Sequence, residues 1–219
     1  MRLLACLFLL AAACSSNAPK PTTTPQPTTT PTGTAKTAQV AVALRPGTKV
    51  VQTIHADMDG DGIDEIAVWS QAEVAPEGSP LRQSYVDVFS AQSGTTKKVL
   101  DAGGSALTVD PKVVGQQVQF FRFVTFNGHP DLVLGVLNEG AGAGPLDLWV
   151  WSWGTPLRQE FRYSTTVDGN LALRGNQVTL DTGSYKPSDP MCCPSGMSHI
   201  VIGNKDGKIG IVSETTTKS

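Results

Sequence analysis

Closely spaced acidic residues between positions 57 and 65 could do the clearest chemistry in this sequence. The stretch reads D-M-D-G-D-G-I-D-E and contains D-x-D-x-D-G from Asp57 to Gly62. Carboxylates at every second position can turn toward one point where glycine permits a sharp bend of the chain. A hard cation such as Ca²⁺ takes about six to eight oxygen ligands. We therefore expect a calcium-binding loop, and the alternative is a solvated acidic turn.

The spacing of the acids decides which kind of calcium loop is expected. An EF-hand needs a glutamate at position 12 counted from Asp57, and that position is Val68. The pattern closes at position 9 instead, and D-x-D-x-D-G-x-x-[DE] before an apolar strand resembles the calcium loops of FG-GAP and VCBS repeat proteins, including integrin-type β-propellers. The resemblance implies a structural Ca²⁺ held by the side chains of Asp57, Asp59, Asp61 and Glu65 and the backbone carbonyl of Ile63.

Cysteine is the second residue type with chemistry of its own. Of the four cysteines, Cys6 lies in an N-terminal export signal and Cys14 directly follows that signal, which leaves Cys192 and Cys193 in the folded part. Outside the cytoplasm thiols tend to oxidise, and these two are adjacent, so we expect them to form a disulfide with each other. Such a ring is strained and more readily reduced. A tight structural turn and a redox-active or ligand-facing turn are both compatible with this pair.

The residues around the cysteine pair resemble a group of bacterial envelope proteins. The chain reads D-P-M-C-C-P-S from Asp189 to Ser195, after a strand at 176–180, and an acidic D-x-D-G-D-G turn lies early in the same chain. The resemblance implies a fold and an envelope location, and it carries no known activity.

Three tryptophans could form a ligand face. Trp149, Trp151 and Trp153 alternate along LDLWVWSW, so they share one face of a strand. Rings on one face pack in a core more often than they form a carbohydrate platform. If the face were exposed, a glycan-binding protein or a secreted hydrolase would be the alternative function. The sequence contains three histidines and neither of the hydrolase motifs G-x-S-x-G and H-E-x-x-H. We therefore assign no catalytic residue.

The N-terminal residues predict export. A basic start is followed by the apolar run Leu3–Ala13, and Ala11-Ala12-Ala13-Cys14 resembles the cleavage site of bacterial lipoproteins. The resemblance implies a signal peptide at 1–13, fatty acids on Cys14 and a place in the cell envelope. In a diderm the outer membrane is favoured, because Ser15 is not acidic. The alternative is an ordinary secretory signal.

The linker and the charge of the chain define the expected partners. The lipidated cysteine and a Thr- and Pro-rich disordered spacer make up residues 14–37, which lack large apolar residues. A formal net charge of −2, from 17 basic and 19 acidic residues, argues against nucleic acid. The expected partners are the membrane, through the lipid anchor, and an envelope protein or a glycan.

The elements that position these residues are short strands, and we expect residues 38–219 to form a single β domain. Apolar runs with β-type alternation are separated by Gly, Pro and Asn turns, and no window shows a helical period. The predicted strands cover residues 50–54, 65–69, 84–90, 95–100, 118–126, 131–137, 146–153, 157–163, 170–174, 177–181, 199–203 and 208–213. The fold class expected is all-β, with antiparallel strands.

An internal echo predicts how these strands are grouped. Glu65 opens the strand EIAVW, and Asp131 opens DLVL 66 residues later; each follows a strand and a glycine-containing turn. We expect two blade-like four-stranded repeats plus C-terminal hairpins, and not a complete propeller. The second turn is two residues shorter and keeps only Asn127 and Asp131, so we expect no metal there.

Overall fold

The computed structural model describes residues 44–74, 81–92, 95–108, 115–139, 144–154, 156–190 and 193–218. These residues form twelve β-strands and one short 3₁₀ helix. The elements are β1 (Lys49–Ala56), β2 (Glu65–Glu73), β3 (Arg82–Gln92), β4 (Thr95–Gly103), η1 (Gly104–Leu107), β5 (Gln116–Thr125), β6 (Pro130–Asn138), β7 (Leu146–Ser152), β8 (Arg158–Ser164), β9 (Gly169–Arg174), β10 (Gln177–Ser184), β11 (Gly196–Lys205) and β12 (Lys208–Lys218). Each predicted strand overlaps one of them, and the all-β fold class is confirmed.

The N-terminal predictions concern a part of the chain outside the described residues. The signal peptide at 1–13, the lipidated Cys14 and the linker at 14–37 all fall there. Within the described ranges, no helix has both the length and the apolar character needed to cross a membrane.

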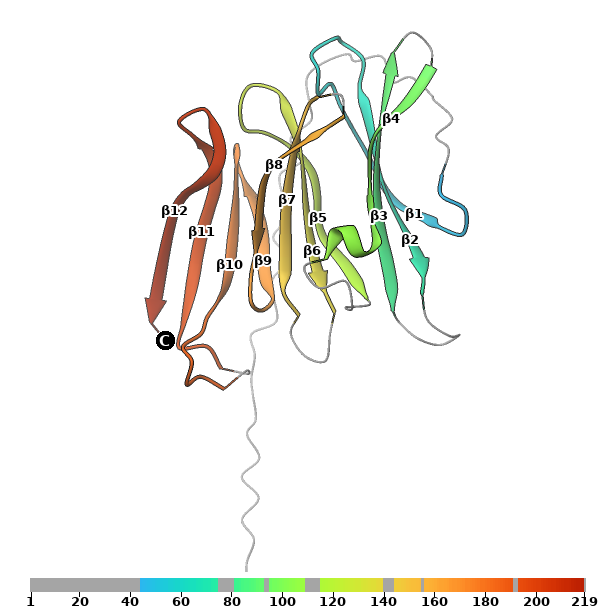
Figure 1. The fold of residues 1–219 in the computed structure, drawn as a ribbon. Helices are drawn as coiled ribbons and strands as arrows, with labels where there is room; N and C mark the ends of the chain where they lie inside the picture. The colour runs from blue at the N-terminus through green and yellow to red at the C-terminus, as the bar shows by residue number, and fades with distance from the viewer. Residues whose placement is uncertain are drawn as a thin grey trace, which may run out of the picture. The chain divides into compact units, whose positions relative to one another are not determined.

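The strands form three antiparallel four-stranded sheets, each connected in chain order. Sheet 1 is β1-β2-β3-β4, sheet 2 is β5-β6-β7-β8 and sheet 3 is β9-β10-β11-β12, as Figure 1 shows. Sheets 1 and 2 are the two blade-like repeats predicted from the sequence. The C-terminal strands were predicted as separate hairpins. In the structure β10 also pairs with β11, so the two hairpins form a third four-stranded sheet whose strands are again in chain order. Over the described ranges, the three sheets do not close into a propeller.

Sheet 2 lies between the other two sheets, because its two faces belong to two different hydrophobic clusters. Along β7, Trp149 and Trp151 pack in a cluster with residues of sheet 1, such as Val86. Leu148 and Val150 alternate with them and pack in a cluster with residues of sheet 3. A strand buried on both faces is apolar at nearly every position, which explains the unbroken apolar character of β7.

The burial of β7 corrects the candidate ligand face of the tryptophans. Trp149 and Trp151 are only 1% and 5% exposed, and their rings stack with centroids 6.3 Å apart and an interplanar angle of 5°. The interpretation as an exposed carbohydrate platform is therefore wrong for these two rings, because sheet 1 covers them. Trp153 follows the end of β7, is partly buried against the same cluster and reaches the pocket described below.

Candidate metal loop and the adjoining pocket

The acidic loop joins β1 to β2 and brings together three of the predicted ligands. One carboxylate oxygen from each of Asp57, Asp59 and Asp61 lies within 4.8 Å of the other two. Gly60 lies between Asp59 and Asp61, and Gly62 follows Asp61; their φ angles are 79° and 86°, in the left-handed region that only glycine enters at little cost. The two glycines therefore let the chain bend so that the aspartates converge.

Hydrogen bonds within the loop hold the aspartates in place. The Asp57 carboxylate accepts the backbone N–H of Gly60 at 2.7 Å and that of Gly62 at 3.0 Å. Asp61 accepts the N–H of Ile63 at 2.7 Å. An ionised carboxylate has about four lone-pair sites, so these bonds leave oxygens able to bind a cation. A donor set made only of oxygens suits a hard divalent cation.

Glu65 is not part of this group of three carboxylates. Its side chain is 1% exposed, and Oε2 accepts the backbone N–H of Met58 at 2.8 Å. Burial raises the pKa of Glu65 to about 7; the hydrogen bond from Met58 opposes that change, and the charges of Asp59 and Asp61 add to it. In this geometry Glu65 fixes the loop from inside. Its role as a ligand, and that of the Ile63 carbonyl, stay predictions.

The loop between β5 and β6 repeats this arrangement without the cluster of acids. Asp131 is 4% exposed, and its Oδ2 accepts the backbone N–H of Phe126 at 3.4 Å. The donor precedes the acid by five residues here and by seven in the pair Met58–Glu65, which matches the two-residue difference between the loops. Glu65 and Asp131 thus hold equivalent positions in sheets 1 and 2.

Asp131 has a second hydrogen-bond partner besides Phe126. The hydroxyl of Ser152, at the end of β7, donates to Asp131 Oδ1 at 2.5 Å. Burial raises the pKa of Asp131, and the hydrogen bonds from Ser152 and Phe126 oppose this effect. The carboxylate of Glu160 adds to the rise, whereas the charge of His129 lowers the pKa.

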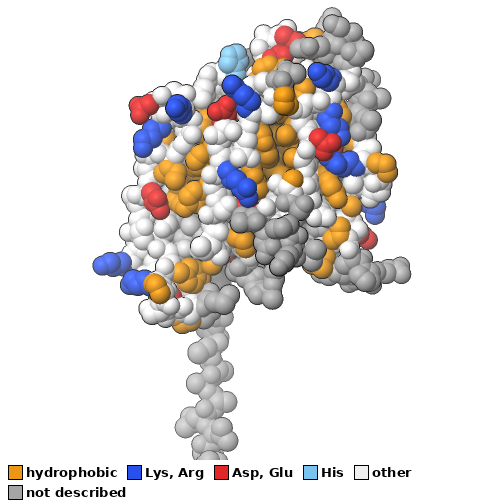
Figure 2. All heavy atoms as spheres, in the orientation of Figure 1, with side chains coloured by type: hydrophobic (Ala, Val, Ile, Leu, Met, Phe, Trp, Pro, Cys, Tyr) orange, Lys and Arg blue, Asp and Glu red, His pale blue; other side chains and the backbone are white. Residues whose placement is uncertain are grey.

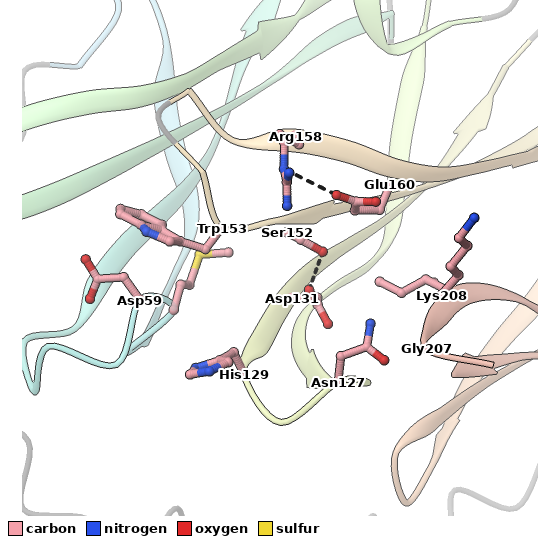
Figure 3. Close-up of a pocket in the computed structure, with 12 residues that line it drawn as sticks. Asp59, Asn127, His129, Asp131, Ser152, Trp153, Arg158, Glu160, Gly207 and Lys208 are labelled. Atoms are coloured by element: carbon pink, nitrogen blue, oxygen red, sulfur yellow. Dashed lines mark hydrogen bonds and ion pairs between the residues drawn. The ribbon is translucent and has the colours of Figure 1, made fainter. Parts of the chain in front are cut away.

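A pocket of about 390 Å³ lies beside the acidic loop, where loops and strand ends of the three sheets meet. Figure 3 shows its side chains converging from separate parts of the chain. Sheet 1 contributes Met58 and Asp59, and sheet 3 contributes the start of β12. The remaining lining residues come from sheet 2, namely Asn127, His129, Asp131, Ser152, Trp153, Arg158 and Glu160.

The pocket and the acidic loop are in contact through His129. A Cβ atom added to Gly60 would lie 3.4 Å from Cε1 of His129, so the imidazole packs against the loop backbone. Sequence analysis did not find this pocket, because its residues are spread from Met58 to Ile209. Of its residues, the sequence had singled out Trp153, as the last of the alternating tryptophans, and Asn127 and Asp131, as the remains of the second acidic turn.

The segment 185–195 between β10 and β11 carries the cysteine pair, and Asp189 organises it. The carboxylate of Asp189 accepts the N–H of Lys186 at 2.7 Å, the N–H of Ser195 at 2.9 Å and the Ser195 hydroxyl. The hydrogen bond from Lys186, followed by those from Ser195, lowers the pKa of Asp189. Cys193 is exposed, and its N–H donates to the Pro190 carbonyl at 3.0 Å. Cys192 lies outside the described residues, so the disulfide stays a prediction.

Comparison of this chain with protein-family models finds no matching family, and comparison with curated proteins finds no matching protein. The function is therefore argued from the loop and the pocket themselves.

Proposed function

We propose that this protein is an exported, lipid-anchored envelope protein whose β domain holds one Ca²⁺ in the β1–β2 loop. In this proposal the domain is a non-catalytic binding or structural module. The observation that carries the calcium part is the convergence of the Asp57, Asp59 and Asp61 carboxylates within 4.8 Å of one another. Three negative charges at this distance repel one another, and a divalent cation would offset that repulsion.

The role proposed for the ion is to fix the turn between the first two strands. The loop rests on the buried Glu65, which accepts the Met58 N–H, and on His129 of the neighbouring sheet. An ion bound to the three aspartates would hold this contact between sheets 1 and 2. Because most of the core lies away from the loop, the fold itself should persist without calcium.

Calorimetric titration of calcium into metal-free protein tests this proposal. Extracellular calcium modules bind with dissociation constants of about 10⁻⁴ to 10⁻³ M, and we expect a single site in that range. Asp59→Asn should abolish the heat of binding. The matched control is Asp206→Asn, which changes an aspartate in the β11–β12 turn whose positive φ of 54° asparagine tolerates. Absence of heat in the wild type, or equal heat in Asp59→Asn, would contradict the calcium site.

Calcium should also stabilise the wild-type protein against heat. At about 1 mM calcium and a dissociation constant of about 0.1 mM, mass action adds about 1.4 kcal/mol. For a domain of this size that amounts to a few degrees in melting temperature. Chelation should remove the gain in the wild type and in Asp206→Asn, and it should change nothing in Asp59→Asn.

The proposed lipid anchor is supported by Ala11-Ala12-Ala13-Cys14 and by the polar residues that follow it. Labelling of cells with an alkyne fatty acid should mark the wild type and leave Cys14→Ser unmarked. Equal labelling of the two proteins, or labelling of neither, would refute the anchor. An anchored protein fractionates with the envelope, and in a diderm we expect the outer membrane.

A glycan-binding role is the second candidate function. The alternating tryptophans no longer support it as a surface, since two of them are buried. The third, Trp153, lines the pocket beside the acidic loop, and this observation keeps glycan binding as a candidate.

A further inference from the structure

We propose that the pocket formed by the three sheets binds a saccharide, with Asp131 at its base and Trp153 as its aromatic wall. This inference rests on the role of a binding module proposed above, and it specifies the ligand class. Asp131 and Trp153 lie outside the acidic loop, although Asp59 of that loop also lines the pocket, so the two sites are tested by separate measurements.

Asp131 supplies a buried hydrogen-bond acceptor to the pocket. Its side chain is 4% exposed and is fixed by the Ser152 hydroxyl on Oδ1 and the Phe126 N–H on Oδ2. A carboxylate can accept about four hydrogen bonds, so capacity remains for hydroxyl groups of a ligand. An acceptor held in place by two protein donors loses little entropy when a ligand binds.

Trp153 supplies a flat apolar surface in the same pocket. The ring is partly buried against the core of sheets 1 and 2, and its remaining surface lines the pocket. A sugar ring has an apolar face of C–H groups and an edge of hydroxyls. An aromatic ring beside a carboxylate suits both features at once, as in small-ligand pockets with a few convergent polar groups.

The charges of the pocket favour a neutral ligand with many hydroxyls over a simple ion. Arg158 and Glu160 form an ion pair with Nε and Oε1 3.4 Å apart, and Lys208 faces them from sheet 3. An anion would meet the carboxylates of Asp59, Asp131 and Glu160, and a cation would meet Arg158 and Lys208. Hydroxyl groups can donate to the carboxylates and accept from the basic side chains.

The size and position of the pocket agree with this ligand class. A pocket of about 390 Å³ is at the small end of the range of about 300 to 1,000 Å³ for small-molecule sites, so a mono- or disaccharide would fill it. On the face that Figure 2 shows, Lys and Arg are scattered among acidic side chains and form no continuous basic patch.

Saturation-transfer NMR with full-length Cys14→Ser protein tests the proposal. The probes are glucose, galactose, N-acetylglucosamine and their disaccharides, with choline and acetate as a simple cation and a simple anion. We expect saturation transfer to at least one saccharide and a change of tryptophan fluorescence with the same affinity. Transfer to choline or acetate alone, or to none of the probes, would overturn the proposal.

Three variants locate the site. Trp153→Leu keeps apolar packing but removes the flat ring, and Glu160→Gln removes a charge from a side chain that is 39% exposed. Each should weaken saccharide binding about tenfold, the effect of losing one good contact. The control Glu214→Gln, on the exposed part of β12, should bind as the wild type does. Equal binding by all three variants would refute this pocket as the site.

The calcium and saccharide proposals can fail separately. Calcium calorimetry on the same protein reports on the acidic loop, and saturation transfer reports on the pocket. Loss of the calcium heat in Asp59→Asn with saccharide binding absent from the wild type would refute only the pocket.

Discussion

Glu65→Gln should change how the stability of the metal-free protein depends on pH. Glu65 has a pKa of about 7 in the folded protein against 4.5 for a free side chain, because burial disfavours its charged form. Between pH 4.5 and 7 the folded protein therefore binds more protons than the unfolded protein at this position. Stability from this group is complete below pH 4.5 and is lost as the pH rises through 7.

The size of the effect follows from the two pKa values. A difference from 4.5 to about 7 corresponds to a loss on the order of 3 kcal/mol above pH 7. Glutamine keeps a carbonyl oxygen for the Met58 N–H, which donates at 2.8 Å, but it cannot ionise. The buried amide N–H₂ of glutamine can cost stability, but that cost is the same at every pH.

The assay is urea unfolding in the presence of a chelator, at intervals from pH 4 to pH 8. The wild type minus Glu65→Gln difference cancels the other titrating groups, and it should fall by a few kcal/mol across this range. A difference that stays constant with pH would refute the argument that burial of a neutral Glu65 carboxyl stabilises the loop. With calcium present, loss of the calcium response in Glu65→Gln would identify Glu65 as a ligand as well.

Three further predictions follow from burial and chain position. Asp131→Asn should reduce the loss of stability that accompanies rising pH, because burial raises the pKa of Asp131 as it does that of Glu65. The same series of urea unfolding experiments measures this effect, and a variant whose free energy of unfolding depends on pH as that of the wild type does would contradict it. Trp149→Ala should cost about 3 to 5 kcal/mol in urea unfolding, and Trp153→Ala should cost clearly less, because Trp149 is 1% exposed and Trp153 is only partly buried; equal costs would contradict this ranking. Mass spectrometry without reduction should find the peptide containing Cys192 and Cys193 lighter by about 2 Da, the mass of two hydrogens lost on oxidation, whereas two alkylatable thiols would exclude the disulfide.

The sequence predicts those features that depend on neighbouring residues. Strand alternation and turn residues give every strand, and the echo between Glu65 and Asp131 gives the equivalence of sheets 1 and 2. The convergence of Asp57, Asp59 and Asp61 is local for the same reason, since glycine spacing alone bends the loop. Each of these features involves contacts within a few residues or within one hairpin.

Other features depend on which sheet covers which face, and local patterns do not contain that information. Alternation shows that Trp149 and Trp151 share a face, but only the packing of sheet 1 on sheet 2 buries them. The third sheet was missed because its first two strands, β9 and β10, are joined by the short turn Gly175-Asn176, which lacks the acidic or Asn-Gly loop found before Glu65 and Asp131. The pocket was missed because its walls come from all three sheets.

The equivalence of Glu65 and Asp131 links the metal loop to the pocket. In both sheets an acid at the start of the second strand is buried and accepts an N–H from the loop before it. In sheet 1 the loop is two residues longer and adds three converging aspartates, and the charges of Asp59 and Asp61 contribute to the raised pKa of Glu65. In sheet 2 the shorter loop lacks those aspartates, and the acid lines the pocket. The acid at this position therefore lies beneath a candidate cation site in sheet 1 and at the base of a candidate ligand site in sheet 2.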